Sequence, residues 1–296
     1  MTKDETFELL EILKSTGQSD ENRIDAIRQL GNMKEIMAVE PLIRIVSNSY
    51  NSPLVRIVAA SALGSIGHKG AVEPLIKVLE QNEKDNEVFS WSINDVRVSI
   101  VFALGDLGGD RAISSLTKTL DDEIGQVRWA AASALGKTKS PRAVDSLLRK
   151  FKDPVFDNDD AIASALGVLE DEKAVEPLLQ YLNDEKNKNR RTLETVALAL
   201  TKISDKYDEK IATAIIAAAS RVNSNYLMEI YVDYQKNKTS IKSNMYDEAE
   251  KGISHMPSEQ RKWATNKLTE LRKKEQLTTL IPIKKQDETE NEKIRI

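Results

Sequence analysis

Apolar residues recur along the chain at spacings of three and four, in short segments separated by Gly, Pro and charged residues. Residues 54–63 and 71–79 are two such segments; Pro53 stands directly before the first, and Gly64 and Gly67 lie between them. These spacings place the apolar side chains on one face of a helix, and Pro is tolerated in a helix's first turn. We therefore expect two amphipathic helices, with the two Gly residues loosening the end of the first helix so that the chain can turn.

This helix pair is repeated along the chain. A Leu-Gly dipeptide marks five copies, with the Gly at Gly31, Gly64, Gly105, Gly136 and Gly167. Seven, eight and eleven residues after each Gly come Ala, a β-branched residue and Leu, which share one face of the second helix. These distances are constant, whereas the distance between copies varies. One structural unit has therefore been copied, and we expect the invariant Ala to mark the closest approach of its two helices.

The repeats predict an all-α fold in which helix pairs stack into a solenoid, because one pair cannot bury its apolar face alone. Residues 21–221 contain the five clear copies and a degenerate sixth, in which Thr201 replaces the Gly. Residues 1–20 are expected to form a capping helix, and residues 222–281 an irregular helical cap. Residues 282–296 are charged and poor in apolar side chains, which predicts a disordered tail.

Two segments carry a family resemblance: residues 127–136, Val-Arg-Trp-Ala-Ala-Ala-Ser-Ala-Leu-Gly, and residues 71–75, Ala-Val-Glu-Pro-Leu. They resemble the HEAT repeat family, in particular its short phycobilisome-lyase-like repeats. The resemblance covers roughly residues 20 to 200 and implies a right-handed, HEAT/ARM-like superhelix whose second helices line the concave face. It says little about function, because a fold of this kind serves many roles.

Composition narrows the possible partners. The chain has 296 residues, of which 40% are hydrophobic and 30% charged, and its formal net charge is -4. No strong field would draw it to nucleic acid or to an anionic membrane. There is no Cys, which excludes disulfides, thiolate ligands and Cys nucleophiles. No apolar run is long enough to span a bilayer and no signal peptide is visible, so we expect a cytoplasmic protein.

Candidate chemistry is sparse. The two His residues, His68 and His255, are not followed by Glu. Deoxyhypusine hydroxylase resembles a pair of such solenoids that holds a di-iron centre through His-Glu dipeptides, so that activity is not expected. Residues 105–109 are rich in Gly but lack the Lys-Ser/Thr of a phosphate-binding loop. Trp129 replaces the Ile or Val of other copies, which favours packing over a DNA glycosylase's base-handling role. We expect no catalytic residue, metal or cofactor, although a lyase-like activity stays open.

Two charged columns lie on the second helices. Acidic residues prevail nine positions after the Gly, at Glu40, Glu73, Ser114, Asp145 and Glu176. Basic residues prevail thirteen positions after it, at Arg44, Lys77, Lys118, Arg149 and Gln180. The columns predict ion pairs one turn apart, namely Glu40–Arg44, Glu73–Lys77 and Asp145–Arg149. They are interpreted either as intrahelical support on a solvated face or as a mixed-charge groove for a segment of another protein.

Two further features have both a structural and a functional interpretation. Eight residues before the Gly, four copies carry Arg, at Arg23, Arg56, Arg97 and Arg128. A ladder that bonds adjacent repeats is favoured over a phosphate-binding stripe, because the position lies inside an apolar helix start. Residues 82–94 form an insertion that contains Phe89 and Trp91. This loop either binds a partner or folds back over the junction of the second and third copies, and we expect packing.

The sequence thus predicts a non-enzymatic scaffold or adaptor that binds another protein or peptide on its concave face. The candidate binding residues are Arg44, Lys77, Lys118, Arg149, Phe89 and Trp91. The alternative is a phycobilin lyase-like, chromophore-handling subunit. A nucleic-acid-binding solenoid is a further alternative, which the carboxylate column disfavours. The sequence indicates neither the identity of the partner nor the oligomeric state.

Overall fold

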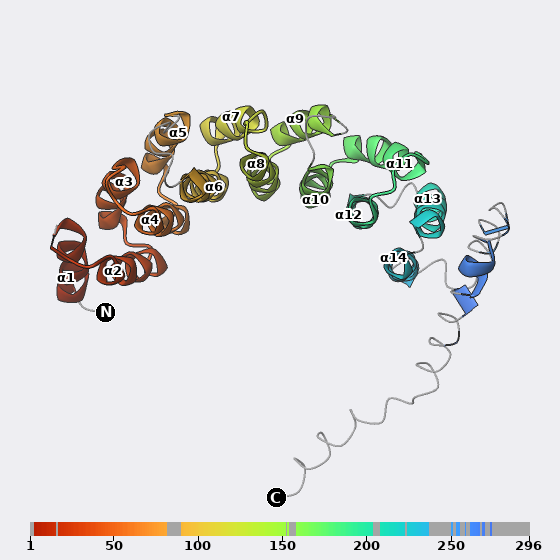
Figure 1. Cartoon of the computed structure of the whole chain (residues 1–296), viewed down its shortest axis with the longest axis horizontal. Coiled ribbons are helices and arrows are strands. Elements are labelled where there is room, and N and C mark those ends of the chain that lie inside the picture. The colour runs from red at the N-terminus through yellow and green to blue at the C-terminus, as the bar shows by residue number, and fades with distance from the viewer. Residues whose placement is uncertain are drawn as a thin grey trace, which may run out of the picture. The chain divides into compact units, whose positions relative to one another are not determined.

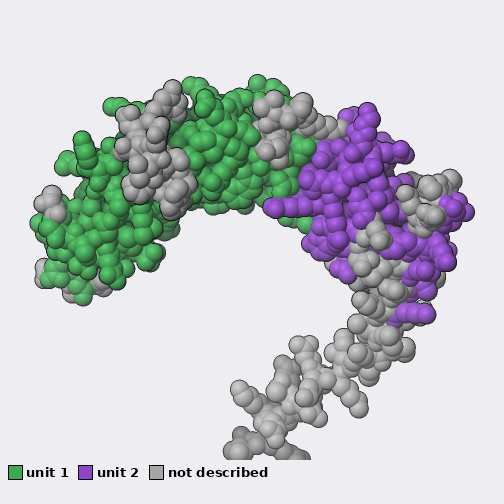
Figure 2. Space-filling view, viewed as in Figure 1, with its two compact units in different colours: residues 1–178, 198–205 green, residues 179–197, 206–296 purple. Residues whose placement is uncertain are grey.

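The computed structural model describes residues 3–15, 17–81, 90–151, 153, 158–203, 208–222 and 224–236, with short stretches between 250 and 273. The regular elements of these residues are helices (Figure 1). The chain divides into two compact units: unit 1 comprises residues 1–178 and 198–205, and unit 2 comprises residues 179–197 and 206–296 (Figure 2). The expected disordered tail, residues 282–296, lies outside the described residues.

Two layers of helices alternate along unit 1. The outer helices are α1 (Lys3–Lys14), α3 (Val39–Ser47), α5 (Val72–Glu80), α7 (Asp110–Thr119) and α9 (Arg142–Lys150). The inner helices are α2 (Asp20–Asn32), α4 (Pro53–Ile66), α6 (Ser90–Leu107), α8 (Gly125–Lys137) and α10 (Asp159–Leu169). Short 3-10 turns, η1 (Ile36–Ala38) and η2 (Lys69–Ala71), lead into α3 and α5, and η4 (Glu172–Ala174) leads into α11 (Val175–Asn183).

Local residues explain where the helices begin and end. Pro53 occupies the first turn of α4, and Gly67 ends that helix with a left-handed φ of 77°. Ser19 caps α2 by accepting a hydrogen bond of 3.3 Å from the backbone N–H of Asn22. The helix starts and the turn at Gly67 that the pattern predicted are therefore confirmed.

The repeated Gly has a different role from the predicted one, because it packs two helices together instead of loosening a helix end. Gly64 lies within α4, and a Cβ built on it would come within 3.1 Å of the Ala103 Cα of α6. A Cβ on Gly136 would come within 2.9 Å of the Ala165 Cα of α10. The same contact recurs in five pairs: Gly31–Ala62, Gly64–Ala103, Gly105–Ala134, Gly136–Ala165 and Gly167–Ala199. Gly is therefore required because no side chain fits between adjacent inner helices.

The predicted core positions are buried. The Ala and Leu columns of the outer helices have at most 1% exposure, at Ala38, Leu42, Ala71, Leu75, Ala112, Leu116, Ala143, Leu147, Ala174 and Leu178. The invariant Ala thus belongs to the core as predicted. The closest approach that we assigned to it is the one made by Gly and Ala of the inner helices.

The inner helices form the concave side of unit 1, which corrects the expectation that the second helices do so (Figure 1). Adjacent inner helices pack closely through their Gly–Ala contacts, whereas adjacent outer helices touch more sparsely. A stack whose two layers have unequal spacing curves toward the closely spaced layer. The second helices, with their charged columns, therefore lie on the outside of the curve in this unit.

The Arg column forms the predicted structural ladder. Its side chains hold the loops that join each outer helix to the next inner helix. Arg23 donates to Asn51 over 3.0 Å, and Arg56, which is only 3% exposed, donates to the Val46 carbonyl over 2.9 Å. The loop between α3 and α4 is thus held by one arginine from each neighbouring inner helix. These bonds link two successive repeats without any partner molecule.

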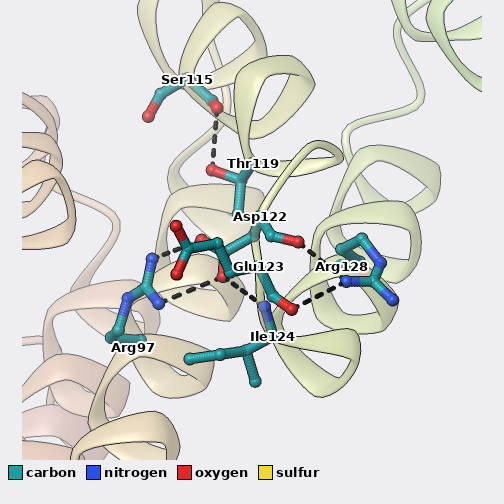
Figure 3. Close-up of polar contacts among 7 residues, drawn as sticks. All are labelled: Arg97, Ser115, Thr119, Asp122, Glu123, Ile124 and Arg128. Carbon is teal, nitrogen blue, oxygen red and sulfur yellow. Dashed lines mark hydrogen bonds and ion pairs between the residues drawn. The ribbon is translucent and has the colours of Figure 1, made fainter. Parts of the chain in front are cut away.

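Between α7 and α8 two arginines hold one loop (Figure 3). Arg97 of α6 forms a bidentate ion pair with the carboxylate of Asp122, and both side chains are nearly buried, at 16% and 11% exposure. Arg128 of α8 donates to the backbone carbonyls of Asp122 and Glu123 over 2.8 and 3.1 Å. The carboxylate of Asp122 also accepts the N–H of Ile124, which shapes the loop.

In unit 2, α13 (Asp208–Val222) and α14 (Asn225–Lys236) pack against each other. These two helices lie in the ranges where the sixth copy and the irregular helical cap were expected. Arg221 donates to the carbonyls of Leu182, Asp184 and Asn187, and burial lowers the pKa of Arg221. It holds a loop as the ladder arginines do, although it lies on a different helix of the repeat.

Candidate functional site

The predicted cation column is exposed but does not form a single site. Arg44, Lys77, Lys118 and Arg149 each lie in the last turn of an outer helix. A cation there is stabilised by the partial negative charge of the helix C-terminus, without any ligand. Of the three ion pairs predicted one turn apart, Glu40–Arg44 is confirmed, with 3.3 Å between the Glu40 Oε1 and Arg44 Nε atoms.

The other two predicted pairs are wrong, because both acids bind a basic residue of the next repeat instead. Arg111 donates to Glu73 over 2.6 and 2.9 Å, and lies six residues after Gly105. Analogous bridges join Asp110 to Arg142 over 2.6 Å and Asp145 to Lys173 over 3.2 Å. The hydrogen bond with Arg111 lowers the pKa of Glu73 and raises the pKa of Arg111. The basic column six residues after the Gly was the overlooked sequence signal.

Lys118 and Arg149 meet at a cleft of about 160 Å³ between α7 and α9. Of its three cations, only Lys150 forms ion pairs with described residues. Lys150 binds Asp121 and Asp153, and the hydrogen bond with Asp121 raises the pKa of Lys150. The C-terminal ends of two helices add partial negative charge. The cleft therefore keeps a small excess of positive charge at Lys118 and Arg149, which the helix C-termini partly offset.

Arg44 borders a larger cleft, of about 640 Å³, between α1 and α3. Phe89 lies outside the described residues. Trp91 belongs to the backbone of α6, but its side chain is not described. Since α6 begins at Ser90, the last five residues of the predicted 82–94 loop are helical. Whether this segment packs or binds stays a prediction.

The inner helices carry rows of exposed residues that do not belong to the predicted binding residues. On α8, Gln126, Trp129, Ser133 and Lys137 are the residues left uncovered by the neighbouring helices. The same register holds Leu54, Ile57, Ser61 and Ser65 on α4, Asp95, Val98, Phe102 and Asp106 on α6, and Asp160, Ser164 and Val168 on α10. We name these four rows the inner stripe. They lie on the layer that forms the concave side of unit 1.

Two aromatic rings lie at the centre of the inner stripe. The rings of Phe102 and Trp129 meet edge to face, with 5.8 Å between their centroids and an interplanar angle of 79°. Trp129 keeps 38% of its surface exposed. The Lys137 ammonium lies 5.2 Å from the centre of the Phe102 ring and 3.6 Å from the Asp106 carboxylate. Rings and charges in this arrangement form a surface that large apolar side chains and cations can contact.

Apolar side chains continue the inner stripe on both sides of the rings. Leu54 is 55% exposed and Val168 is 40% exposed, whereas Ile57 and Val98 are half-buried. The serines between them are small, so that the surface is shallow. Exposed apolar residues grouped on one face indicate an interaction surface, whereas scattered ones do not.

A catalytic or metal centre has little support in the described ranges. They contain no group of three His, Cys, Asp or Glu side chains that could hold a metal ion. None of the helices in these ranges is both long and apolar enough to cross a bilayer. The inner stripe is therefore the strongest candidate site among the described residues.

The profile of the HEAT repeats family matches residues 7–93 and 91–167, which together make up more than half of the chain. The chain belongs to the HEAT repeat family. The profile of the PBS lyase HEAT-like repeat matches residues 160–184. The resemblance inferred from the sequence is thus confirmed. Comparison with curated proteins gives no significant sequence match.

Several solved structures resemble this HEAT-repeat protein in fold. The complex of CpcE and CpcF of phycocyanin lyase from Nostoc sp. PCC7120 is 22% identical, with 79% of this chain and 94% of that chain covered and a TM-score of 0.48. Human deoxyhypusine hydroxylase in complex with glycerol is 18% identical, with 67% and 88% covered and a TM-score of 0.33. An engineered protein is 17% identical, with 88% and 81% covered and a TM-score of 0.40. These likenesses concern the type of fold alone.

The stacking of the helices explains why the sequence favoured the outer helices as the binding surface and not the inner stripe. Trp129 shares its column with Ile24, Ile57 and Val98, residue types that are typical of a buried position. Its exposure depends on which helix layer lies on the concave side, and that follows from the Gly–Ala contacts. The serines at Ser61, Ser133 and Ser164 were an available signal, since small polar residues three positions before the Gly are unusual in a buried column.

Proposed function

We propose that this HEAT-repeat protein is a non-enzymatic scaffold that binds a protein or peptide along the inner stripe of unit 1. The observation that supports it most directly is the exposed Trp129, edge to face with Phe102, on a concave layer of helices. Aromatic anchors surrounded by apolar and polar neighbours commonly dominate protein interfaces. The proposal keeps the predicted scaffold role and moves its surface from the outer to the inner helices.

The test compares capture of partners from native lysate by three forms of the full chain. These are the unmodified protein, Trp129→Ala with Phe102→Ala, and Lys77→Ala with Lys118→Ala. We expect the aromatic double variant to lose the captured protein and the lysine double variant to retain it. Circular dichroism checks that each variant keeps its helices. Equal capture by the aromatic variant would contradict the proposed surface, and loss in the lysine variant alone would favour the outer helices.

A phycobilin lyase-like, chromophore-handling role is the second candidate. Of the two functions, it is the one that the family matches support, through the PBS lyase HEAT-like repeat at residues 160–184. A bilin is a conjugated tetrapyrrole, whose flat rings could stack on Trp129. Adding a bilin should then change the visible absorbance of the bilin and, in a variant whose other two Trp residues are replaced by Phe, quench Trp129 emission. Unchanged spectra at high bilin concentration would contradict this role.

A further inference from the structure

The inner stripe carries an excess of negative charge. Its four rows contain three carboxylates, Asp95, Asp106 and Asp160, and one ammonium, Lys137. The ammonium of Lys137 already forms an ion pair with the carboxylate of Asp106, at 3.6 Å. The carboxylate of Asp95 is half-buried and forms no ion pair with any described residue. A partner that approaches this surface therefore meets apolar groups and the carboxylate of Asp95, which has no described cation beside it.

The serines of the inner stripe do not offset this charge. Ser65 donates its hydroxyl to the Ser61 carbonyl over 3.1 Å, and Ser133 donates to the Trp129 carbonyl over 3.0 Å. Hydroxyl groups that are turned back onto their own helix are not available as donors to a ligand. With these two hydroxyls turned inward, most of the charged groups that the surface offers are carboxylate acceptors, which cationic donors of a partner would complement.

Lys137 shows how a cation fits this surface. Phe102 and Asp106 lie one turn apart on α6, and the ammonium from α8 lies between them, 5.2 Å from the ring centre. Trp129 offers the larger ring, and its one ring contact among the described residues is the edge contact with Phe102. No described cation lies over it. Trp is the preferred ring for a cation, and desolvation by a partner would strengthen the attraction.

We propose that the occupant of the inner stripe is a basic amphipathic segment of a partner protein. Its apolar side chains would lie against Val98, Phe102 and Trp129, and its Lys or Arg side chains would lie over Trp129 and beside Asp95. This inference rests on the proposed scaffold function and adds the chemistry of the partner. The recognition depends on charge complementarity, which steers encounter and excludes acidic segments.

The test uses two synthetic helical peptides of equal length, one built from Leu and Lys and the other from Leu and Glu. Trp91→Phe and Trp263→Phe are introduced into the full chain so that Trp129 is the only Trp reporter. We expect the Lys peptide to shift Trp129 emission to shorter wavelength, with an affinity that falls as salt rises. The Glu peptide should leave the emission unchanged at the same concentration.

Two charge variants distinguish binding of the Lys peptide at the inner stripe from its attraction to the overall negative charge of the protein. Asp95→Asn should weaken binding of the Lys peptide several-fold, whereas Glu80→Gln, the same charge change on α5, should leave it unchanged. Equal binding of both peptides, or equal loss in both charge variants, would overturn the inference. If neither peptide binds while lysate capture still requires Trp129, the basic partner is wrong and the scaffold function stands. If lysate capture is independent of Trp129, the scaffold surface itself is wrong.

Discussion

At the scale of single residues, the Gly–Ala contact determines how the helices stack. Each Gly of an inner helix faces the Ala two positions before the Gly of the next inner helix. Because the partner lies in a different repeat, the sequence shows both residues but not their contact. Gly near a helix end is also a common stop signal, which is why the pattern suggested a turn. The columns alone could predict the burial of Ala and Leu, since burial follows from helical periodicity.

Gly136→Ala should destabilise unit 1 by about 1–3 kcal/mol, because the added methyl overpacks a contact that backbone atoms make. Its Cβ would lie 2.9 Å from the Ala165 Cα. Thermal and urea unfolding measure the loss. Gly17→Ala is the matched control, since no atom lies within 4 Å of its built Cβ. Equal stability of the two variants would show that the inner helices can separate at no cost.

At the scale of elements, loops and outer helices are held by different kinds of bonds. Nearly buried arginines hold the loops, whereas exposed ion pairs join successive outer helices. The Arg ladder could be predicted because a charged column inside an apolar helix start needs an internal partner. The outer-helix pairs could not be predicted in the same way. An acid such as Glu73 lies within reach of Lys77 on its own helix and of Arg111 on the next, and only the spacing of the helices decides between them.

Asp122→Ala should destabilise the protein by about 3 kcal/mol, because it leaves the nearly buried guanidinium of Arg97 without its carboxylate. Glu123→Ala is the matched control in the same loop. Arg128 uses only the backbone carbonyl of Glu123, which Ala retains. Chemical denaturation of both variants should therefore separate them clearly. A control that unfolds as easily as Asp122→Ala would mean that the loop tolerates no substitution at all.

Arg111→Ala should return the pKa of Glu73 upward, toward its ordinary value, because the hydrogen bond from Arg111 is what lowers it. A lowered carboxyl pKa in the folded state stabilises the protein at neutral pH, and that contribution is lost as pH falls through the folded-state pKa. A carboxyl carbon NMR titration measures the change. Arg142→Ala, which removes a bridge to Asp110 instead, should leave the titration of Glu73 unaltered.

At the scale of the whole molecule, the two helix layers of unit 1 have different chemistry. The outer layer carries acidic and basic columns side by side, and the inner layer carries the aromatic rings and more carboxylates than ammonium groups. The all-α solenoid and its repeats could be predicted from constant spacing within each copy. Which layer faces the concave side could not, because curvature depends on how closely the layers pack. The exposure of Trp129 depends on the same property.

This distribution of charge predicts that the protein does not bind nucleic acid at neutral pH. A concave surface with more carboxylate than ammonium repels a phosphate backbone, and the formal net charge of -4 adds no attraction. A gel-shift titration with double-stranded DNA and single-stranded RNA at low salt checks this expectation. A shift that weakens steeply with salt would show that the basic outer helices recruit phosphate.

The Gly–Ala contact joins unlike faces, so it could in principle continue from one molecule to the next and build a fibre. At each end of the series, however, one residue of the matching pair is missing. In the first inner helix the place of Ala is taken by Gln29, which is exposed, and after Ala199 the place of Gly is taken by Thr201. A second copy that approached the face of α2 would meet the exposed Gln29 side chain, where the series elsewhere has the methyl group of Ala. Gln29 thus disfavours continuation of the Gly–Ala series from one molecule to the next.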